Sequence, residues 1–366
     1  MLPKTKIGVL GAGAISKAYL KHFKEQLHFA LDVVAVADIV ESLAATRAKE
    51  AGFSEAIACT PDALYANRDV SIIVNLTPIW THLETNTKIL EAGKHCYSEK
   101  PLAQNRDDAA KLLAFAAKKG LRVGCAPDTW LGGGHQCARK MLDDGVIGKP
   151  LCANAAIWME VNSQRSLSKM IGAMHFDIGP YYAAALVNMF GPAKRVTGFA
   201  TIPIKEKWAE ANHVSNFGEK VVPEVPTLVS GIIEFHNGVL ANLTTANDAH
   251  QYLPRLEVVG TQGMIECPDP NAFGEKAKLQ LKWQAMQEMP ISHDYKDNAR
   301  GLGVAEMAYA ILQNRDHRAS GELALHVVDI LQGLVESNGN AVDMVTTCKR
   351  PAALRAGRGI CAIWDK

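Results

Sequence analysis

Residues 1–125 alternate short apolar segments with helical segments, and this alternation restricts the fold more than any other feature of the chain. The strand-like segments are 6–10, 31–37, 56–58, 71–76, 94–98 and 121–125, and the helical segments are 14–26, 41–51, 61–65, 80–92 and 104–119. Strands that are apolar along their whole length are buried on both faces, which is typical of parallel sheets covered by helices. The pattern therefore predicts an α/β fold with a doubly wound parallel sheet in residues 1–125.

Residues 126–366 follow a different pattern, which predicts a second domain. Strand-like segments occur at 152–160, 196–202, 228–236, 239–245 and 256–259, and amphipathic helical segments at 304–314 and 322–337. Asn237-Gly238, between two of these strands, is a typical hairpin turn. We therefore expect an α+β domain built on a large, mostly antiparallel open sheet. Such a sheet leaves a broad face to be covered, so we also expect a homo-oligomer.

The charge balance restricts the partners of the chain. Lys plus Arg number 39 and Asp plus Glu 38, for a net charge of +1, whereas nucleic acids and anionic membranes attract a concentrated positive surface. No uncharged run reaches the roughly 20 residues of a membrane-spanning helix, and the first residues do not resemble an export signal. The eight cysteines lack the spacing of zinc ligands or redox pairs. We expect a cytoplasmic protein without a metal site, a nucleic-acid partner or a membrane partner.

A glycine-rich turn follows the first predicted strand and indicates a dinucleotide site. Gly11 permits a tight turn, and Gly13 lets the backbone approach a pyrophosphate at the helix N-terminus, beside Ala14 and Ile15. Asp38 ends the second strand, where a carboxylate accepts the adenosine-ribose hydroxyls and repels a 2′-phosphate. The alternative for Asp38 is a helix cap. We therefore expect a Rossmann domain that binds NAD in preference to NADP.

Three further motifs are Thr77-Pro78 with His82, Glu99-Lys100-Pro101, and Asp177-Ile178-Gly179. Together with the glycine turn they resemble the Gfo/Idh/MocA oxidoreductase family, which includes glucose-fructose oxidoreductase and inositol dehydrogenase. The resemblance covers nearly the whole chain, and it implies that the homo-oligomer is a homodimer or homotetramer. It implies hydride transfer between NAD and a secondary alcohol or ketone of a sugar, polyol or related ring. It also implies cofactor contacts by Thr77, Pro78, Trp80, His82, Glu99 and Lys100, with a purely structural role as the alternative for His82.

The resemblance further implies three catalytic residues. Lys100 is expected beside the nicotinamide, where it exchanges a proton with the reacting oxygen, and we expect the positive ring to lower its pKa. Asp177 is expected to orient the substrate hydroxyl and Lys100. The family has a histidine four residues after this aspartate, but this chain has Tyr181. Because residues i and i+4 share a helix face, Tyr181 is expected to relay the proton, with simple packing as its alternative.

Four other residues are candidates for substrate contact, each with a structural alternative. Asp128 follows the sixth predicted strand and either binds a substrate hydroxyl or caps a helix. Trp158 and Arg165 begin the second domain, where relatives bind sugars, although Trp158 also fits core packing. His175 lies just before Asp177 and is either a substrate contact or substitute base, or a buried structural histidine.

Two other functions remain compatible with these motifs. The first is redox-neutral sugar modification, in which NAD oxidises the substrate transiently and then reduces it again after cleavage or epimerisation. The second is a non-catalytic regulator that senses a dinucleotide. Lys100 and Asp177 occurring together favour an enzyme over a regulator.

Overall fold

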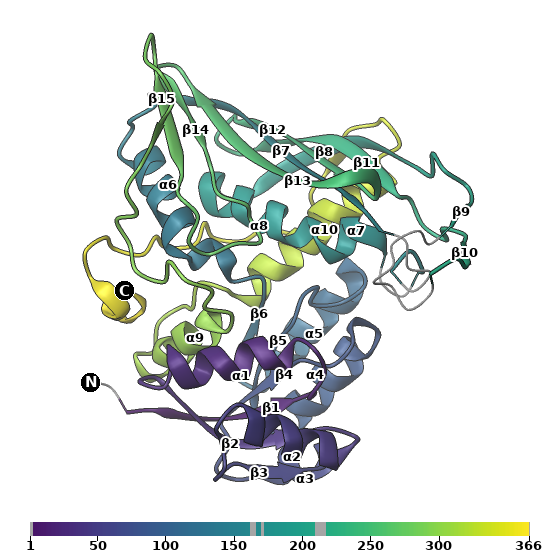
Figure 1. Ribbon diagram of the computed structural model, residues 1–366, viewed down its shortest axis with the longest axis vertical. Coiled ribbons are helices and arrows are strands. Elements are labelled where there is room, and N and C mark those ends of the chain that lie inside the picture. The colour runs from purple at the N-terminus through teal and green to yellow at the C-terminus, as the bar shows by residue number, and fades with distance from the viewer. Residues whose placement is uncertain (1–2, 162–165, 170–171, 209–216, 366) are drawn as a thin grey trace.

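The computed structural model describes residues 3–161, 166–169, 172–208 and 217–365. These residues form two large sheets, one in each lobe of the molecule, and a small two-stranded sheet (Figure 1). No helix within these residues has the length and apolar character needed to cross a bilayer.

The first lobe contains a parallel sheet whose strands come from the N-terminal part of the chain. These strands are β1 (Thr5–Leu10), β2 (Leu31–Ala37), β3 (Ile57–Cys59), β4 (Ile72–Asn75), β5 (His95–Ser98) and β6 (Val123–Cys125). Their order is β3-β2-β1-β4-β5-β6, and every neighbouring pair is parallel. This order is that of a dinucleotide-binding Rossmann sheet, whose crevice opens between β1 and β4. The predicted doubly wound sheet is therefore confirmed.

The predicted helices between these strands form with shifts of a few residues. They are α1 (Ser16–Glu25), α2 (Glu41–Glu50), α3 (Pro61–Ala66), α4 (His82–Glu91) and α5 (Arg106–Lys118). Thr60 caps α3, as its position before a proline predicted, and Asn105 caps α5. The predicted helix start at Trp80 is wrong by one short turn, because residues Ile79–Thr81 form a 3₁₀ turn (η1) before α4 begins.

The second lobe contains a mixed sheet that is larger than the sequence predicted. In strand order it contains β16 (Gln287–Glu288), β15 (Lys278–Leu281), β14 (Gly263–Glu266), β13 (Asp248–Gly260), β7 (Pro150–Glu160), β12 (Leu240–Ala246), β11 (Leu228–Phe235), β8 (Ala193–Thr201) and β17 (Val342–Asp343). A separate hairpin joins β9 (Lys207–Trp208) and β10 (Lys220–Val221). Only β12 and β7 pair in parallel, so the expected mostly antiparallel sheet is confirmed.

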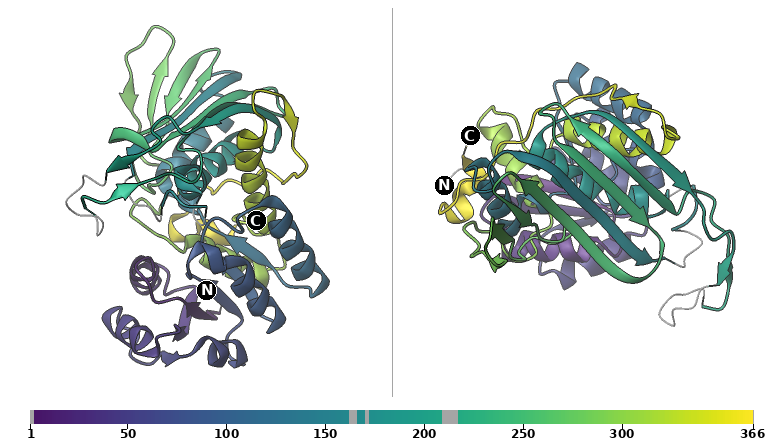
Figure 2. Two further views of the ribbon diagram at one scale, coloured as in Figure 1. Left: turned by 90° about the vertical axis from the view of Figure 1, so that its right-hand side faces the viewer. Right: turned by 90° about the horizontal axis from the view of Figure 1, so that it is seen from above.

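Helices cover one face of this large sheet. They are α6 (Gly133–Asp143), α7 (Ala173–Asp177), α8 (Gly179–Phe190) and α10 (Gly321–Glu336). In the right panel of Figure 2 the sheet lies in front of these helices, and no helix of the described chain covers its outer face. The sequence indicated no helix beyond Tyr181 in this region, because every residue of α8 is buried and a helix that is apolar all round has no amphipathic period.

The C-terminal part of the chain returns to the first lobe. There α9 (Leu302–Leu312) packs near α1 and β6, and α10 contacts both α5 and the large sheet (Figure 1). A backbone bridge joins Gly124 to Ser320, the N-cap of α10. A last short 3₁₀ segment, η3 (Gly359–Trp364), packs on α9. These contacts bring residues from near position 300 to the carboxyl ends of the first-lobe strands.

Candidate active site

The loops that follow β1, β4 and β5 meet at one edge of the first sheet, because parallel strands all end at the same edge. A pocket of about 320 Å³ lies at this edge, between the two lobes. It is lined by Ile15, Thr77, Pro78, Ile79, Trp80, His82, Glu99, Lys100, Asp177, Tyr181, Asn271 and Arg300. Segments far apart in the sequence therefore build a single site.

The glycine turn fits a dinucleotide. Gly11 has φ +100°, and a Cβ there would lie 2.8 Å from the backbone carbonyl of Leu76. A Cβ on Gly13 would meet nothing within 4 Å, so this backbone faces open space at the start of α1. The first N–H groups of a helix have no internal partner and favour an anion. The turn therefore leaves room and hydrogen-bond donors for a pyrophosphate.

Asp38 is fixed beside this turn rather than acting as a helix cap. Its Oδ2 accepts the Ala12 N–H at 2.7 Å, and its Oδ1 accepts the Val40 N–H at 2.9 Å. It gives α2 no side-chain cap. The carboxylate thus stands at the carboxyl end of β2, where an adenosine ribose would lie in a dinucleotide fold.

His82 ties two of the site loops together. Its Nδ1 lies 2.8 Å from the Pro101 carbonyl oxygen and its Nε2 lies 2.9 Å from the Thr77 carbonyl oxygen. Only 1% of the residue is exposed, and burial lowers the pKa of the imidazole. Since both ring nitrogens are occupied, His82 lines the pocket chiefly by holding the Thr77 and Lys100 loops at a fixed spacing.

A buried polar network beneath these loops was not identified from the sequence. Asn75 Nδ2 donates to Asn86 Oδ1 at 2.8 Å, and Asn86 Nδ2 donates to Ser98 Oγ at 3.1 Å. The Thr77 N–H and hydroxyl both donate to Asn75 Oδ1. Buried amides of this kind have all their hydrogen bonds satisfied only in one arrangement. The network therefore fixes the positions of the ends of β4 and β5, where the site loops begin. An asparagine at the end of an apolar strand is the one signal that could have indicated it.

Lys100 and Asp177 form the closest polar contact of the pocket. Lys100 Nζ lies 2.5 Å from Asp177 Oδ1 and 2.6 Å from the Asp177 carbonyl oxygen. Burial lowers the pKa of Lys100, but Asp177, Tyr181 and Glu99 raise it by more, so the net direction is upward. The expected lowering is therefore wrong for the protein without cofactor, because the sequence argument did not include an aspartate in contact with the amine.

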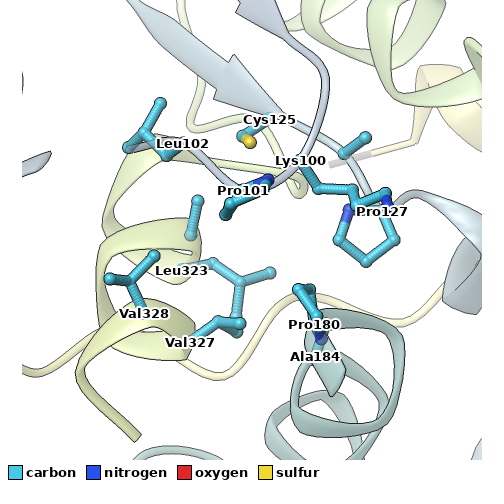
Figure 3. Close-up of a pocket in the computed structure, with 12 residues that line it drawn as sticks. Lys100, Pro101, Leu102, Cys125, Pro127, Pro180, Ala184, Leu323, Val327 and Val328 are labelled. Atoms are coloured by element: carbon cyan, nitrogen blue, oxygen red, sulfur yellow. The ribbon is translucent and has the colours of Figure 1, made fainter. Parts of the chain in front are cut away.

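Lys100 borders a small apolar hollow. Figure 3 shows this hollow between Pro101 and Pro127 on one side and Pro180 and Val327 on the other. Its volume is about 10 Å³, close to the size of one water molecule. The side chains come from the loops after β5 and β6 and from α8 and α10. The position of the amine is set instead by its hydrogen bonds to Asp177.

Tyr181 lies between two cations. Its ring centroid is 5.5 Å from Lys100 Nζ and 5.7 Å from Arg300 Cζ. Arg300 Nη1 donates to the Tyr181 hydroxyl at 3.1 Å, and Arg300 Nη2 donates to Asn271 Oδ1 at 2.7 Å. The continuous helix expected through Asp177 and Tyr181 is wrong: α7 ends at Asp177 and α8 begins at Gly179. Both side chains nevertheless reach the same pocket.

Glu99 is a buried link between the loop after β5 and the first helix. Its Oε1 accepts the Tyr19 hydroxyl at 2.7 Å, and its Oε2 accepts the Lys100 N–H at 3.1 Å. It is only 7% exposed and lines the pocket. Its carboxylate orients the Lys100 backbone and supplies negative charge close to the amine.

Asp128 has a structural role, and the substrate role expected as one of its two alternatives is wrong. Its Oδ2 accepts the N–H groups of Gly301 and Gly303 at 2.9 Å each, and only 1% of the residue is exposed. Burial raises the pKa of this carboxyl to about 6. Asp128 therefore caps a helix, as the other alternative proposed, but the helix is the distant α9 and not the next one in sequence.

His175 is also structural, so the substrate contact or base expected as one alternative is wrong. Its Nε2 lies 2.9 Å from the Leu331 carbonyl oxygen, and its Nδ1 lies 3.0 Å from the Thr245 hydroxyl. The side chain joins α7 to β12 and α10 and is 2% exposed. Burial lowers the pKa of the imidazole to about 4.

The buried neutral His175 predicts a loss of stability in mild acid. A lowered pKa gives stability that is present above about 6.5 and is lost as pH falls toward about 4. We expect His175 to account for about 3 kcal/mol of the fall in unfolding free energy over this window. Urea unfolding at both ends of the window should show a smaller fall for His175→Gln than for wild type. The exposed His250 provides a control, and an equal fall in His175→Gln and His250→Gln would contradict the expectation.

The one remaining substrate candidate within the described residues, Trp158, does not line the pocket. Trp158 lies on β7 next to the fully buried Ile157. Since successive residues of a strand point to opposite faces, Trp158 faces away from the helix-covered side, and the substrate expectation for it is wrong. Arg165 lies outside the described residues. Arg300 and Asn271 line the pocket instead, although neither belongs to a motif or follows a strand of the first sheet.

No group of three or more His, Cys, Asp or Glu in the described chain is arranged to hold a metal ion. The site is instead defined by a glycine turn, a lysine–aspartate pair and a flanking tyrosine, all at the crevice of a Rossmann sheet. This combination defines a dinucleotide-dependent oxidoreductase.

Comparison with known proteins identifies the family. Residues 5–126 match the model of an oxidoreductase family with an NAD-binding Rossmann fold, and residues 135–266 match the GFO/IDH/MocA C-terminal domain. The chain belongs to the Gfo/Idh/MocA oxidoreductase family, as its motifs suggested.

Named relatives and solved structures agree with this assignment. The chain is 25% identical to an inositol 2-dehydrogenase/D-chiro-inositol 3-dehydrogenase of Lactiplantibacillus plantarum, with 80% of this chain and 81% of that protein covered. It is 25% identical to an inositol 2-dehydrogenase of Burkholderia lata, with 96% and 99% covered. A levoglucosan dehydrogenase in complex with NADH and L-sorbose superposes with a TM-score of 0.80 at 20% identity, covering 94% of this chain and all of that one.

Proposed function

We propose that this oxidoreductase transfers a hydride between NAD and a secondary alcohol or ketone of a polyol or cyclic sugar. The observation that carries the proposal is the contact of Lys100 with Asp177 in a pocket that also contains Tyr181 and opens beside the glycine turn. Relatives named as inositol dehydrogenases and a fold shared with a levoglucosan dehydrogenase support a polyhydroxylated ring as the substrate.

The residues of the turn would hold the dinucleotide, with Gly11 to Ile15 at the pyrophosphate and Asp38 at the adenosine ribose. Thr77, Pro78 and Trp80 border the pocket on its β4 side. NAD, when bound, would accept the hydride through its nicotinamide ring. Lys100 exchanges the proton of the reacting hydroxyl, Tyr181 relays it, and Asp177 holds the amine in place.

Because the pKa of Lys100 is raised, the rates of alcohol oxidation and carbonyl reduction should depend differently on pH. A protonated amine donates a hydrogen bond to a substrate carbonyl, which assists reduction. Oxidation of an alcohol needs a neutral amine to accept the hydroxyl proton. We therefore propose that alcohol oxidation speeds up as pH rises through the alkaline range, whereas carbonyl reduction does not.

The deciding experiment mixes the purified protein with NAD or NADP and a panel of inositols, anhydrosugars, aldoses and polyols, and follows the absorbance of the reduced nicotinamide. Reduced cofactor with at least one member of the panel supports the proposal. Substrate conversion by chromatography without net NADH would favour the redox-neutral alternative. Tight NAD binding with no conversion of any member would favour a regulator.

Asp38 gives a prediction for cofactor choice. Asp38→Asn keeps a side-chain oxygen for the Ala12 N–H and removes the charge that repels a 2′-phosphate. We expect the ratio of NADP to NAD affinity to rise about tenfold or more, since one charge contact is worth at least about 1.4 kcal/mol. Kd values for both dinucleotides measure this ratio. The exposed Asp32 on β2 provides the control Asp32→Asn, and an unchanged ratio in Asp38→Asn would remove Asp38 from cofactor selection.

A further inference from the structure

Arg300 is an unassigned charge in the pocket. It precedes Gly301, the N-cap of α9, and Asp128 accepts the Gly301 N–H at 2.9 Å. The buried aspartate after β6 therefore fixes the backbone from which the Arg300 side chain starts. This hydrogen bond places the Arg300 guanidinium, which belongs to the C-terminal part of the chain, at the edge of the first-lobe sheet.

The hydrogen bond between Arg300 and Tyr181 has only one possible direction. A guanidinium has donors and no acceptor, so the phenol oxygen accepts from Arg300 Nη1 at 3.1 Å. The hydroxyl hydrogen has to point elsewhere. Among the described residues, no acceptor lies within hydrogen-bond distance to receive this hydrogen, and Tyr181 lines the pocket.

The charges around Tyr181 come from three segments. Lys100 and Glu99 approach from the loop after β5, Arg300 from the residue before α9, and Asp177 from the end of α7. Burial raises the pKa of Tyr181, Glu99 raises it further, and Lys100 and Arg300 lower it. Lys100 is already paired with Asp177 at 2.5 Å, so Arg300 is the cation that contacts the phenol oxygen directly.

We infer that Arg300 is a positioning residue for Tyr181: it holds the phenol oxygen so that the hydroxyl hydrogen faces the pocket, and its charge favours the phenolate. The inference rests on the proposed function, in which Tyr181 relays the proton of the substrate hydroxyl. In alcohol oxidation Lys100 passes a proton to the phenolate oxygen and takes the proton of the substrate hydroxyl, while the hydride leaves the carbinol carbon for NAD. In carbonyl reduction the Tyr181 hydroxyl returns the proton to Lys100, which gives a proton to the substrate oxygen.

The first test needs no substrate. Alkaline titration of phenolate absorbance, taken as the difference between each protein and the same protein carrying Tyr181→Phe, isolates the midpoint of Tyr181. Arg300→Met is expected to raise this midpoint by about one to two pH units, because a unit charge that donates to the phenol oxygen at 3.1 Å is lost. Arg300→Lys is expected to restore most of the shift. Arg255→Met removes a mostly exposed charge on β13 and is expected to leave the midpoint unchanged.

The second test uses the pH profile of alcohol oxidation. Arg300→Met is expected to move the midpoint of the rise in kcat upward by a similar amount, and to have no such effect in a Tyr181→Phe background. A purely structural role would lower kcat equally at every pH, and a persistent shift in Tyr181→Phe would mean that Arg300 acts through Lys100. Either of these two results would overturn the inference. It would also be overturned if the phenol midpoint were the same as in wild type in both Arg300→Met and Arg300→Lys. Absence of any turnover, with the phenol shift present, would count against the proposed function and not against the positioning role.

Discussion

Lys100→Met is expected to lower kcat by roughly 10²–10⁴-fold, the usual contribution of a positioned proton-transfer group. Methionine keeps an apolar stem of similar length at the edge of the hollow in Figure 3, so the loop after β5 should remain in place. The amine that contacts Asp177 at 2.5 Å is removed. The Kd for NAD should stay nearly unchanged, because the glycine turn and Asp38 are untouched.

The comparison that makes this result decisive is Lys111→Met. Lys111 lies on α5 with 76% of its side chain exposed, 3.6 Å from Asp108. Its replacement is expected to alter neither kcat nor NAD affinity. Turnover of Lys100→Met at the wild-type rate, with NAD binding intact, would exclude the amine from proton transfer.

The two glycines of the turn are expected to separate folding from cofactor binding. Gly11→Ala puts a Cβ about 2.8 Å from the Leu76 carbonyl at φ +100°, a conformation that costs about 1–3 kcal/mol for a non-glycine residue. We expect this loss in unfolding free energy together with weaker NAD binding. Gly13→Val meets no protein atom near its Cβ, so its stability should stay within about 0.5 kcal/mol of wild type.

Gly13→Val is nevertheless expected to weaken NAD binding at least tenfold, because its side chain occupies the space that a pyrophosphate needs. Denaturant unfolding and titration of NAD measure the two quantities separately. If Gly13→Val bound NAD as well as wild type, the dinucleotide would not lie over this turn. If Gly11→Ala kept full stability, the tight approach to Leu76 would not constrain the fold.

Motifs that lie at the ends of strands could be placed from the sequence because parallel strands end together. Gly11, Thr77 and Lys100 are each the first or second residue after an apolar strand, and all three lie at one edge of the sheet. The pattern also predicted the Thr60 cap and the Asn237-Gly238 hairpin, since both are local hydrogen-bond geometries. The individual roles of Lys100, Asp177 and Tyr181 stay predictions until the variants above are measured.

Roles that depend on contacts between distant segments could not be assigned. Asp128 was expected near its own strand, but its hydrogen-bond partners, Gly301 and Gly303, are more than 170 residues away. His175 fitted an active site by position, yet Thr245 and Leu331 enclose it. Trp158 depends on which face of β7 it occupies, and that face is set by the register of the whole sheet.

The sequence by itself determined the Rossmann sheet, its glycine turn and the lysine that follows β5, because apolar periodicity, glycine conformation and strand ends act over a few residues. Only the tertiary structure decided the charge state of that lysine and the pairing of Tyr181 with Arg300. Both depend on burial and on the spatial distances between groups that lie far apart in the sequence. Coulomb energies are set by those distances, and desolvation is set by burial.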